Sequence, residues 1–329
     1  MDKIIGIGNA LVDVLVTLPD DALLREMELP KGSMQLIDEA KLETINKHFS
    51  RMNTYMATGG SAGNTILGLA CMGVSTGFIG KIGTDSYGKF YRENLEKHNI
   101  ENKIQISHQL PSGVASTFIS PDGERTFGTY LGAAATLKAE DLRPDLFKGY
   151  TYLYIEGYLV QDHDMILRAI ELAKEAGLKI CLDMASYNIV ADNLDFFRLL
   201  INKYVDILFA NEEEARIFTA EKDSRQALDV LAGMCGIAIV KAGPKGSYVR
   251  KGTEEIISVG AIPVNKVVDT TGAGDYFAAG FLYGLTEGYP LEKCAKTGAI
   301  LAGNVIQYIG TNIPAEKWDG IKSTIISAE

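Results

Sequence analysis

The stretch Asp269-Thr-Thr-Gly-Ala-Gly-Asp275 is followed without interruption by the apolar run YFAAGFLYGL (276–285). Small residues at 272–274 let the backbone approach a ligand closely. The apolar run predicts a helix whose free N–H groups and positive dipole end point at this loop. Such a turn favours an anion, and a phosphoryl group in particular. The alternative is a glycine-rich turn in which Asp269 caps the helix and Asp275 only complements its dipole.

Asp275 is an odd residue for a simple anion site, because a carboxylate repels phosphate and adds nothing to its binding. It makes sense as a base that accepts a proton from a hydroxyl group attacking the phosphoryl group. Phosphoryl transfer otherwise needs mainly positioning and charge neutralisation. The seven-residue context therefore favours phosphoryl transfer over a plain turn.

A second glycine-rich segment, GGSAGN at 59–64, leads into the apolar run TILGLACMG. Its paired glycines allow close approach at a helix N-terminus, and Asn64 offers both a donor and an acceptor to a hydroxylated ligand such as a sugar. The alternative is that Asn64 caps the helix and the glycines only permit tight packing.

The N-terminal stretch GIGNALVD (6–13) follows a predicted strand. Asp13 only accepts hydrogen bonds, so it can take two neighbouring hydroxyl groups of a sugar. A dinucleotide-binding fingerprint is a weak interpretation, since Leu11 stands at the third glycine position and a strand follows where a helix is needed.

Short β-rich runs recur roughly every 30 residues with helical segments between them, which is the length of a strand, a crossover helix and a loop. They are YTYLYIE (150–156), LKICLD (178–183), VDILFA (205–210) and GIAIVKA (236–242). This spacing predicts a parallel α/β sheet. The apolar positions 165, 166, 169, 170 and 173, and 291, 295, 299, 302 and 306, mark helical faces that should cover both sides of it.

Two of these strands lead into polar segments at the edge where open α/β sheets bind ligands. Asn211 to Glu214 (NEEE) could hold Mg²⁺ through water, or could simply begin a helix with acids that complement its dipole. Lys241 to Ser247 (KAGPKGS) could border a nucleotide, or could be only a turn before another strand.

Two regions break the α/β rhythm. Residues 114–130 alternate apolar and polar side chains around Pro121-Asp122-Gly123, which predicts a hairpin with one solvent-facing side. Residues 11–37 look similar. We expect a small β lid (11–37 and 106–131) beside an α/β nucleotide- and substrate-binding domain (1–10, 38–105 and 132–329).

Composition and the absence of certain motifs exclude several classes of protein function. The net charge is −10, from 32 Lys+Arg against 42 Asp+Glu, which argues against nucleic acid as a partner. No stretch is long and apolar enough to span a membrane, and the N-terminus lacks a signal peptide, so we expect no membrane partner and a cytoplasmic location. The cysteines lack metal or redox spacing. The P-loop, GxSxG and HExxH motifs are also absent.

Together, GGSAGN, DTTGAGD, NEEE and KAGPKG resemble the ribokinase-like, or PfkB-type, family of carbohydrate and nucleoside kinases over nearly the whole chain. The resemblance implies a three-layer α/β/α domain with a β lid, ATP and Mg²⁺ as cofactors, K⁺ in some members, and a monomer or homodimer. It implies Asp275 as catalytic base with the amides of Gly272, Ala273 and Gly274 as anion hole. The other implied site residues are Asn9, Asp13, Gly59, Gly60 and Asn64 for the acceptor, Asn211, Lys241, Gly243, Gly246 and Asn304 for the nucleotide, and Glu214 for the metal.

GNALVD, KGSMQLID, GERTFGTYLGAAATL and YIEGYL look most like the adenosine-kinase-related branch, in which Met34 would approach the acceptor. The segment 183–188 (DMASYN) departs from other branches. Adenosine is favoured over the acceptors of ribokinase-, fructokinase- or 2-keto-3-deoxygluconate-type enzymes. A binding protein without turnover is a second class, against which the intact GAGD weighs. An NAD-dependent oxidoreductase would rest on GIGNALVD alone.

Overall fold

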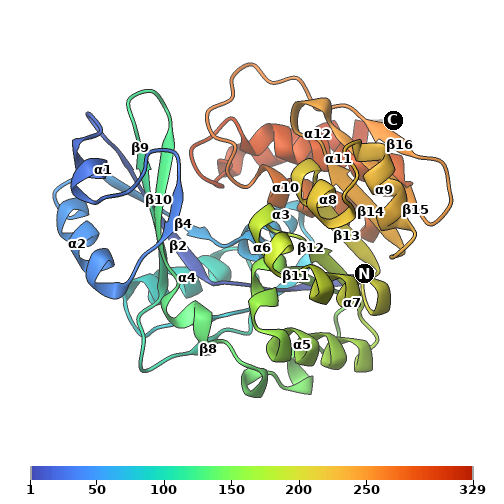
Figure 1. Ribbon diagram of the computed structural model, residues 1–329, viewed down its shortest axis with the longest axis horizontal. Helices are drawn as coiled ribbons and strands as arrows, with labels where there is room; N and C mark the ends of the chain where they lie inside the picture. The colour runs from blue at the N-terminus through green and yellow to red at the C-terminus, as the bar shows by residue number, and fades with distance from the viewer. Residues whose placement is uncertain (1, 328–329) are drawn as a thin grey trace.

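The computed structural model describes residues 2–327 (Figure 1). Its central feature is a nine-stranded sheet in the order β16-β15-β14-β13-β12-β11-β1-β5-β7. Neighbouring strands from β14 to β7 run parallel, and β15 and β16 are antiparallel. The strands are β1 (Lys3–Ile7), β5 (Ser75–Ile79), β7 (Glu101–Asn102), β11 (Tyr152–Glu156), β12 (Lys179–Asp183), β13 (Ile207–Asn211), β14 (Ile237–Lys241), β15 (Ser247–Lys251) and β16 (Ile257–Val259).

The four apolar runs predicted as parallel strands are β11 to β14, adjacent in the sheet and in chain order. Each is almost wholly buried, because helices cover both faces of a parallel sheet. Their carboxyl ends, Glu156, Asp183, Asn211 and Lys241, therefore meet at one edge.

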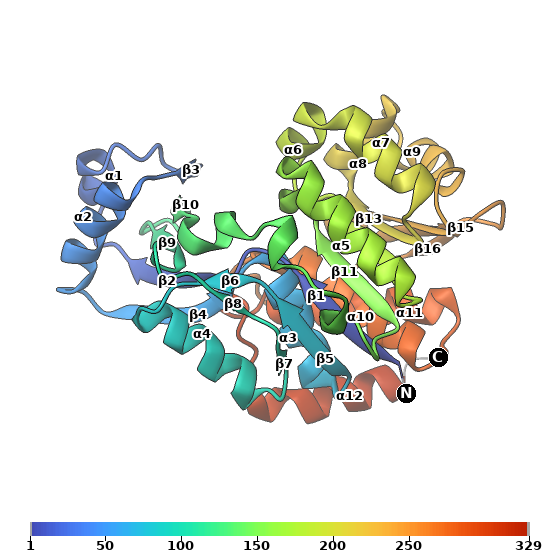
Figure 2. The same ribbon diagram turned by 90° about the horizontal axis from the view of Figure 1, so that it is seen from below.

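Helices lie on both faces of this sheet, as Figure 2 shows, and each face has its own buried apolar cluster. On one face lie α5 (His163–Glu175), α6 (Tyr187–Asp192), α7 (Leu194–Lys203), α8 (Glu212–Thr219) and α9 (Ser224–Ala232). On the other lie α3 (Ser61–Met72), α4 (Ser86–Lys97), α10 (Ala273–Thr286), α11 (Leu291–Val305) and α12 (Trp318–Ser327). Short 3₁₀ helices complete the chain: η1 (Gly132–Thr136), η2 (Ala139–Asp141), η3 (Pro144–Leu146), η4 (Gly157–Gln161), η5 (Gly243–Lys245) and η6 (Ala315–Lys317).

The apolar face predicted for α5 is buried at all five positions. The face predicted for α11 is only partly buried: Ala295 and Ala299 are buried, whereas Ala302 and Ile306 are half-buried. Ala302 and Ile306 pack against the buried cluster of this face and also line a large cavity, which leaves them partly exposed.

A second sheet of five strands has the order β3-β10-β9-β2-β4. The strands are β2 (Leu11–Thr17), β3 (Met34–Leu36), β4 (Thr54–Gly59), β9 (Gly113–Ile119) and β10 (Arg125–Tyr130). β9 and β10 form the predicted antiparallel hairpin, whose turn is closed by a hydrogen bond from the N–H of Gly123 to the carbonyl of Ser120 (2.9 Å). The two insertions thus do build one small sheet.

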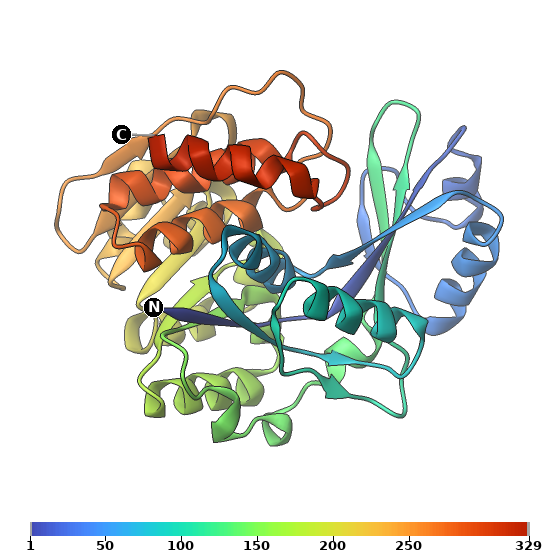
Figure 3. The same ribbon diagram turned by 180° about the vertical axis from the view of Figure 1, so that it is seen from behind.

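Two details of the small sheet differ from the sequence expectation. β4 pairs with β2, although residues 38–105 were assigned to the α/β domain. The hairpin also lacks a freely solvated side, because β9 is buried from Gly113 to Phe118. Helices α1 (Ala22–Glu26) and α2 (Glu39–Phe49) stand beside this sheet (Figure 3), and the rings of Phe49 and Phe118 meet edge to face.

A two-stranded ladder of β6 (Lys81–Ile82) and β8 (Gln105–Ile106) completes the sheets of residues 2–327. Within these residues no helix combines the length and apolar character that crossing a membrane requires. The four cysteines are free thiols, with Cys181 and Cys294 fully buried.

Candidate active site

A cavity of about 820 Å³ lies where the carboxyl edge of the large sheet, the loop before α10 and the small sheet meet. Residues from GIGNALVD, GGSAGN, NEEE, KAGPKGS and DTTGAGD line it, among them Asp13, Asn64, Asn211, Lys241 and Asp275. Ligands of open α/β sheets bind at this edge, outside the carboxyl ends of the strands. The fold therefore brings segments more than 200 residues apart to one site.

The loop before α10 has the geometry of an anion-binding turn. Gly272 caps the helix with φ of 73°, and a methyl group placed on it would lie 2.4 Å from Cγ2 of Thr311, so only glycine fits. Gly274 and Asp275 follow in the first turn, where N–H groups lack partners within the helix. The N–H of Ala273 donates to the carbonyl of Thr270 (3.2 Å), so a bound anion would have to share or replace that bond.

Asp275 is the point where the two glycine-rich segments converge. Its carboxylate accepts hydrogen bonds from Oγ of Ser61 (2.7 Å) and Nδ2 of Asn64 (2.8 Å), both in the first turn of α3. Asn64 is held in turn by the hydroxyl of Thr311, which donates to its Oδ1 (3.1 Å). Burial raises the pKa of Asp275 to about 6, although the two hydrogen bonds oppose the shift. A carboxyl group with such a pKa is ionised at neutral pH and is still a competent base.

Asp13 projects from β2 into the same cavity. Its carboxylate leaves no room for a side chain on Gly59, since a methyl group there would lie 2.3 Å from Oδ1 of Asp13. Burial, and then the negative charges of Asp275 and Asp269, raise the pKa of Asp13 to about 7. Gly60 lines the cavity beside it.

Asn9 does not line this cavity, in contrast to the sequence expectation. It is buried, and its Nδ2 donates to Oε1 of Glu156 (2.7 Å). Glu156 also accepts from the N–H of Ala62 (3.0 Å), so it holds the N-terminus of α3 in place. Burial raises the pKa of Glu156 to about 7. The sequence showed Glu156 only as a strand end, and its partners are visible only in three dimensions.

Met34 is also outside the residues that line the cavity. It lies on β3 at the edge of the small sheet and is 53% exposed. The small sheet instead presents Phe127, from β10, to the cavity. Tyr158, just after β11, also lines the cavity. No sequence motif marked Phe127 or Tyr158 as a site residue.

Asn211 and Glu214 form a reciprocal cap at the start of α8. Oδ1 of Asn211 accepts from the N–H groups of Glu213 and Glu214 (2.9 Å each), and Glu214 accepts from the N–H (2.7 Å) and Nδ2 (2.6 Å) of Asn211. The helix-start alternative is thus realised, while both residues also line the cavity. Burial and the nearby Asp183 raise the pKa of Glu214 to about 7.

The carboxylates in the cavity fit Mg²⁺ only as a largely hydrated ion. Both oxygens of Glu214 already accept hydrogen bonds, and within residues 2–327 no group of three or more His, Cys, Asp or Glu side chains has metal-binding geometry. Mg²⁺ usually keeps several waters and binds through one or two carboxylates plus substrate phosphates. Asn211 and Glu214 line the cavity and are suitably placed for such water-mediated contacts.

Lys241 ends β14 and forms an ion pair with Asp183, which ends β12 (2.6 Å). Burial opposes the charge on Lys241, but the carboxylates of Asp183 and Glu214 outweigh this and raise its pKa. Gly243 and Gly246 line the cavity just beyond it.

Part of the cavity lining is apolar, and we call this part the apolar slot. Its walls come from the loop after β16, from Phe277 and from α11; the lining residues are Ile262, Pro263, Val264, Val267, Phe277, Ala299, Ala302, Gly303 and Ile306. A flat heteroaromatic ring suits such walls. Asn304 is not among them, because its Nδ2 donates to the carbonyl of Ile300 (2.8 Å) within its own helix.

Arg125 links the small sheet to the loop before α10. It forms an ion pair with Asp269 (2.6 Å) and donates to Oγ1 of Thr271 (3.2 Å). Asp269 also accepts from the N–H groups of Thr271 (2.9 Å) and Gly310 (2.6 Å). Arg125 could not be recognised from the sequence, since nothing local marks a residue whose partners lie about 145 positions away.

Residues 34–318 match the pfkB family carbohydrate kinases. The structure is similar to a probable sugar kinase from Rhizobium etli (TM-score 0.88, 33% identity, 98% of this chain and 99% of that one). It is also similar to an adenosine kinase from Sinorhizobium meliloti (TM-score 0.86, 35% identity, 100% and 99%). A curated adenosine kinase from Saccharomyces cerevisiae is 28% identical over 338 residues, which cover 95% of this chain and 97% of that protein. The expected ribokinase-like fold is confirmed.

Proposed function

The chain belongs to the pfkB family of carbohydrate kinases, and from this premise we propose that it transfers the γ-phosphate of ATP to a hydroxymethyl group of a nucleoside, adenosine in particular. The family makes it a phosphotransferase with an alcohol group as acceptor. The acceptor and the residue roles below are our proposal.

The observation that carries the proposal is the position of Asp275. Its carboxylate is held by Ser61 and Asn64 from one glycine-rich segment and sits in the first turn of the helix that follows the other. We assign it as the base that takes the proton of the acceptor hydroxyl as that oxygen attacks the γ-phosphorus. The amides of Gly272, Ala273 and Gly274, at the positive end of α10, stabilise the charge on the transferred group.

On the donor side, the apolar slot takes the base of ATP, and Gly243 and Gly246 border its ribose and phosphates. Asn211 and Glu214 line the same cavity, and we assign them to hold Mg²⁺ through water. Bound Mg²⁺ would neutralise part of the negative charge of the phosphate groups.

On the acceptor side, the carboxylate of Asp13 accepts hydrogen bonds from ring hydroxyl groups beside Asp275, and the amide of Asn64 donates to such a group. Gly60 allows the substrate to approach the backbone closely. Phe127 and Tyr158 supply aromatic surface next to them. A nucleoside base would cover this surface, whereas a free sugar would leave it facing water, and this favours a nucleoside. The similarity to adenosine kinases points the same way. A free sugar is the alternative, supported by the similarity to a probable sugar kinase.

ADP release coupled to a reporter enzyme tests the proposal with adenosine, other nucleosides, ribose, fructose and 2-keto-3-deoxygluconate. We expect the highest kcat/KM for adenosine. A higher value for a free sugar would overturn the nucleoside assignment. Ligand binding without ADP release from any compound would instead indicate a binding protein without turnover.

A further inference from the structure

The ion pair between Asp183 and Lys241 lies inside the cavity, and the proposed function assigns it no role. The two residues end strands β12 and β14, on either side of β13, and their charged atoms are 2.6 Å apart. The side chains are only 6% and 16% exposed. A pair this well buried loses much solvation, so its geometry matters.

The carboxylate of Asp183 is fixed by its own turn. Oδ1 accepts from the N–H of Ala185 (3.0 Å), which leaves Oδ2 for Lys241. Ala185 has φ of 66°, a left-handed conformation that costs free energy for a residue with a side chain. Such strain persists only where the surrounding structure holds it, and it concentrates at functional sites.

Lys241 in turn touches the glycine-rich segment at the start of α10. A methyl group placed on Gly274 would lie 3.1 Å from Nζ of Lys241, so the ammonium group packs directly on that backbone. Among the described residues that line the cavity, Lys241 is the single Lys or Arg, against four carboxylates. A triphosphate entering here would meet its one protein cation beside Gly274.

We propose that Asp183 is a positioning residue that holds the ammonium group of Lys241 against Gly274. In that position the ammonium group contacts the phosphoryl group during transfer. This rests on the proposed function. Asp183 acts through Lys241 and does not itself touch the reacting atoms.

Charge and position make opposite predictions for Asp183→Asn. Removing a carboxylate from a site for a polyanion should by charge alone leave ATP binding unchanged or improve it. Losing the orientation of Lys241 should reduce transition-state stabilisation and hence kcat. We expect kcat to fall about 10-fold or more, with the KM for ATP unchanged or lower.

A double-mutant cycle tests whether Asp183 works through Lys241. We expect Lys241→Met to lower kcat about 10²- to 10³-fold, the scale for losing one group that stabilises developing charge. Adding Asp183→Asn to Lys241→Met should change kcat by less than about threefold. Lys241→Arg, which keeps the charge, should lose less than Lys241→Met.

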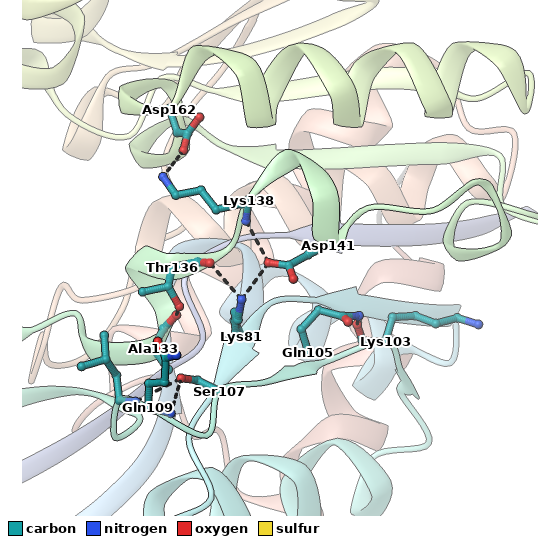
Figure 4. Close-up of polar contacts among 11 residues, drawn as sticks. Lys81, Lys103, Gln105, Ser107, Gln109, Ala133, Thr136, Lys138, Asp141 and Asp162 are labelled. Atoms are coloured by element: carbon teal, nitrogen blue, oxygen red, sulfur yellow. Dashed lines mark hydrogen bonds and ion pairs between the residues drawn. The ribbon is translucent and has the colours of Figure 1, made fainter.

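The chain offers a matched control in the ion pair of Lys81 with Asp141 (2.8 Å), whose side chains are 16% and 22% exposed and lie outside the cavity lining. Figure 4 shows Lys81 between the carbonyl of Thr136 and Asp141. Asp141→Asn should leave kcat and both KM values unchanged, and its thermal midpoint shows what losing a comparable pair costs in stability.

Additive effects of the two substitutions, or an Asp183→Asn variant with wild-type or higher kcat, would overturn the positioning role. If Asp183→Asn does not fold, Asp183→Glu replaces it in the cycle: the charge stays but the carboxylate moves, so kcat should still fall, and an unchanged kcat overturns the role. A wild-type protein that phosphorylates no compound of the acceptor panel would instead overturn the proposed function, so the two failures are distinguishable.

Discussion

At the scale of single residues, the site is dominated by carboxylates whose protons are held more tightly than usual. Asp275 and Asp13 have pKa values of about 6 and 7, raised first by burial. A polyanionic substrate has to be accommodated among them, so the balance of charge around Asp275 decides at which pH the site works.

The pH dependence of kcat/KM for the acceptor follows from the pKa of Asp275. The base must be ionised, and its proton is bound below about pH 6. We expect kcat/KM to begin to fall below about pH 7, where Asp13 takes up a proton, and to fall by about tenfold or more per pH unit below pH 6, where Asp275 does so too, because this parameter reports the free enzyme. A pH–rate series from pH 8 to 5 at fixed ionic strength measures it. A flat profile over that range would exclude Asp275 as the titrating base.

Substitution of Asp13 tests the acceptor side. Asp13→Ala removes the acceptor of two hydroxyl groups, which costs roughly 1–3 kcal/mol, or about 5- to 150-fold in apparent affinity. The KM for the acceptor should rise by that factor, while the KM for ATP changes little. Deoxy analogues of the true acceptor should show a matching loss. A rise in the KM for ATP alone would remove Asp13 from the acceptor site.

Residue-level predictions from sequence succeeded where a motif also dictates local backbone geometry. The glycines of the loop before α10 and the helix start at NEEE (211–214) belong to this class, whereas the ligand roles of these residues stay predictions. Asn9 and Asn304 were expected to contact ligands, but their side-chain amides donate to protein acceptors. Asn9 donates to Glu156, and Asn304 donates to the carbonyl of Ile300. A side chain's choice between ligand and protein partners depends on tertiary contacts, which local sequence does not contain.

At the scale of elements, strands β11 to β14 could be recognised from the sequence because each is a short, continuous apolar run. β4 could not, since TYMATG has neither a continuous apolar run nor a clear alternation, and its pairing with β2 is made across about 40 residues. Whether such a segment forms a strand depends on pairing partners that lie far away in the sequence.

The small sheet should respond to substrate as a lid. Arg125 on β10 already contacts Asp269 and Thr271 beside the anion-binding loop. Closure excludes water and completes a site of this kind. We expect slower hydrogen exchange in residues 11–37 and 113–130 when the acceptor is bound, with the β12–β14 strands as an internal reference. Equal exchange in both states would count against a mobile lid.

At the scale of the whole molecule, burial of carboxyl groups at one site affects stability. Asp13, Glu156, Glu214 and Asp275 have pKa values of about 6 to 7 in the folded protein. The same groups release their protons near pH 4 when unfolded. Between about pH 4 and 7 the folded state therefore binds more protons, and the free energy of unfolding falls as pH rises. Surface carboxylates with lowered pKa values, such as Asp21 and Asp122, change the free energy of unfolding at pH values below this window, where their stabilising contribution is lost as pH falls.

Urea unfolding of the ligand-free protein at pH 5, 6, 7 and 8 measures this contribution. Glu156→Gln removes one titrating group and keeps one hydrogen-bond acceptor, so its stability should depend less steeply on pH than that of the wild type. A wild-type protein more stable at pH 8 than at pH 5, or a variant with an unchanged slope, would contradict this account.

The most direct test of the central claim is phosphoryl transfer by Asp275→Asn. The substitution keeps the shape of the side chain beside Ser61 and Asn64 but removes its ability to accept the hydroxyl proton. With adenosine and ATP at saturation, kcat should drop about 10²-fold or more, the usual scale for loss of a general base. Calorimetry should show nearly unchanged binding of both substrates. An unchanged kcat would contradict the assignment of Asp275 as the base.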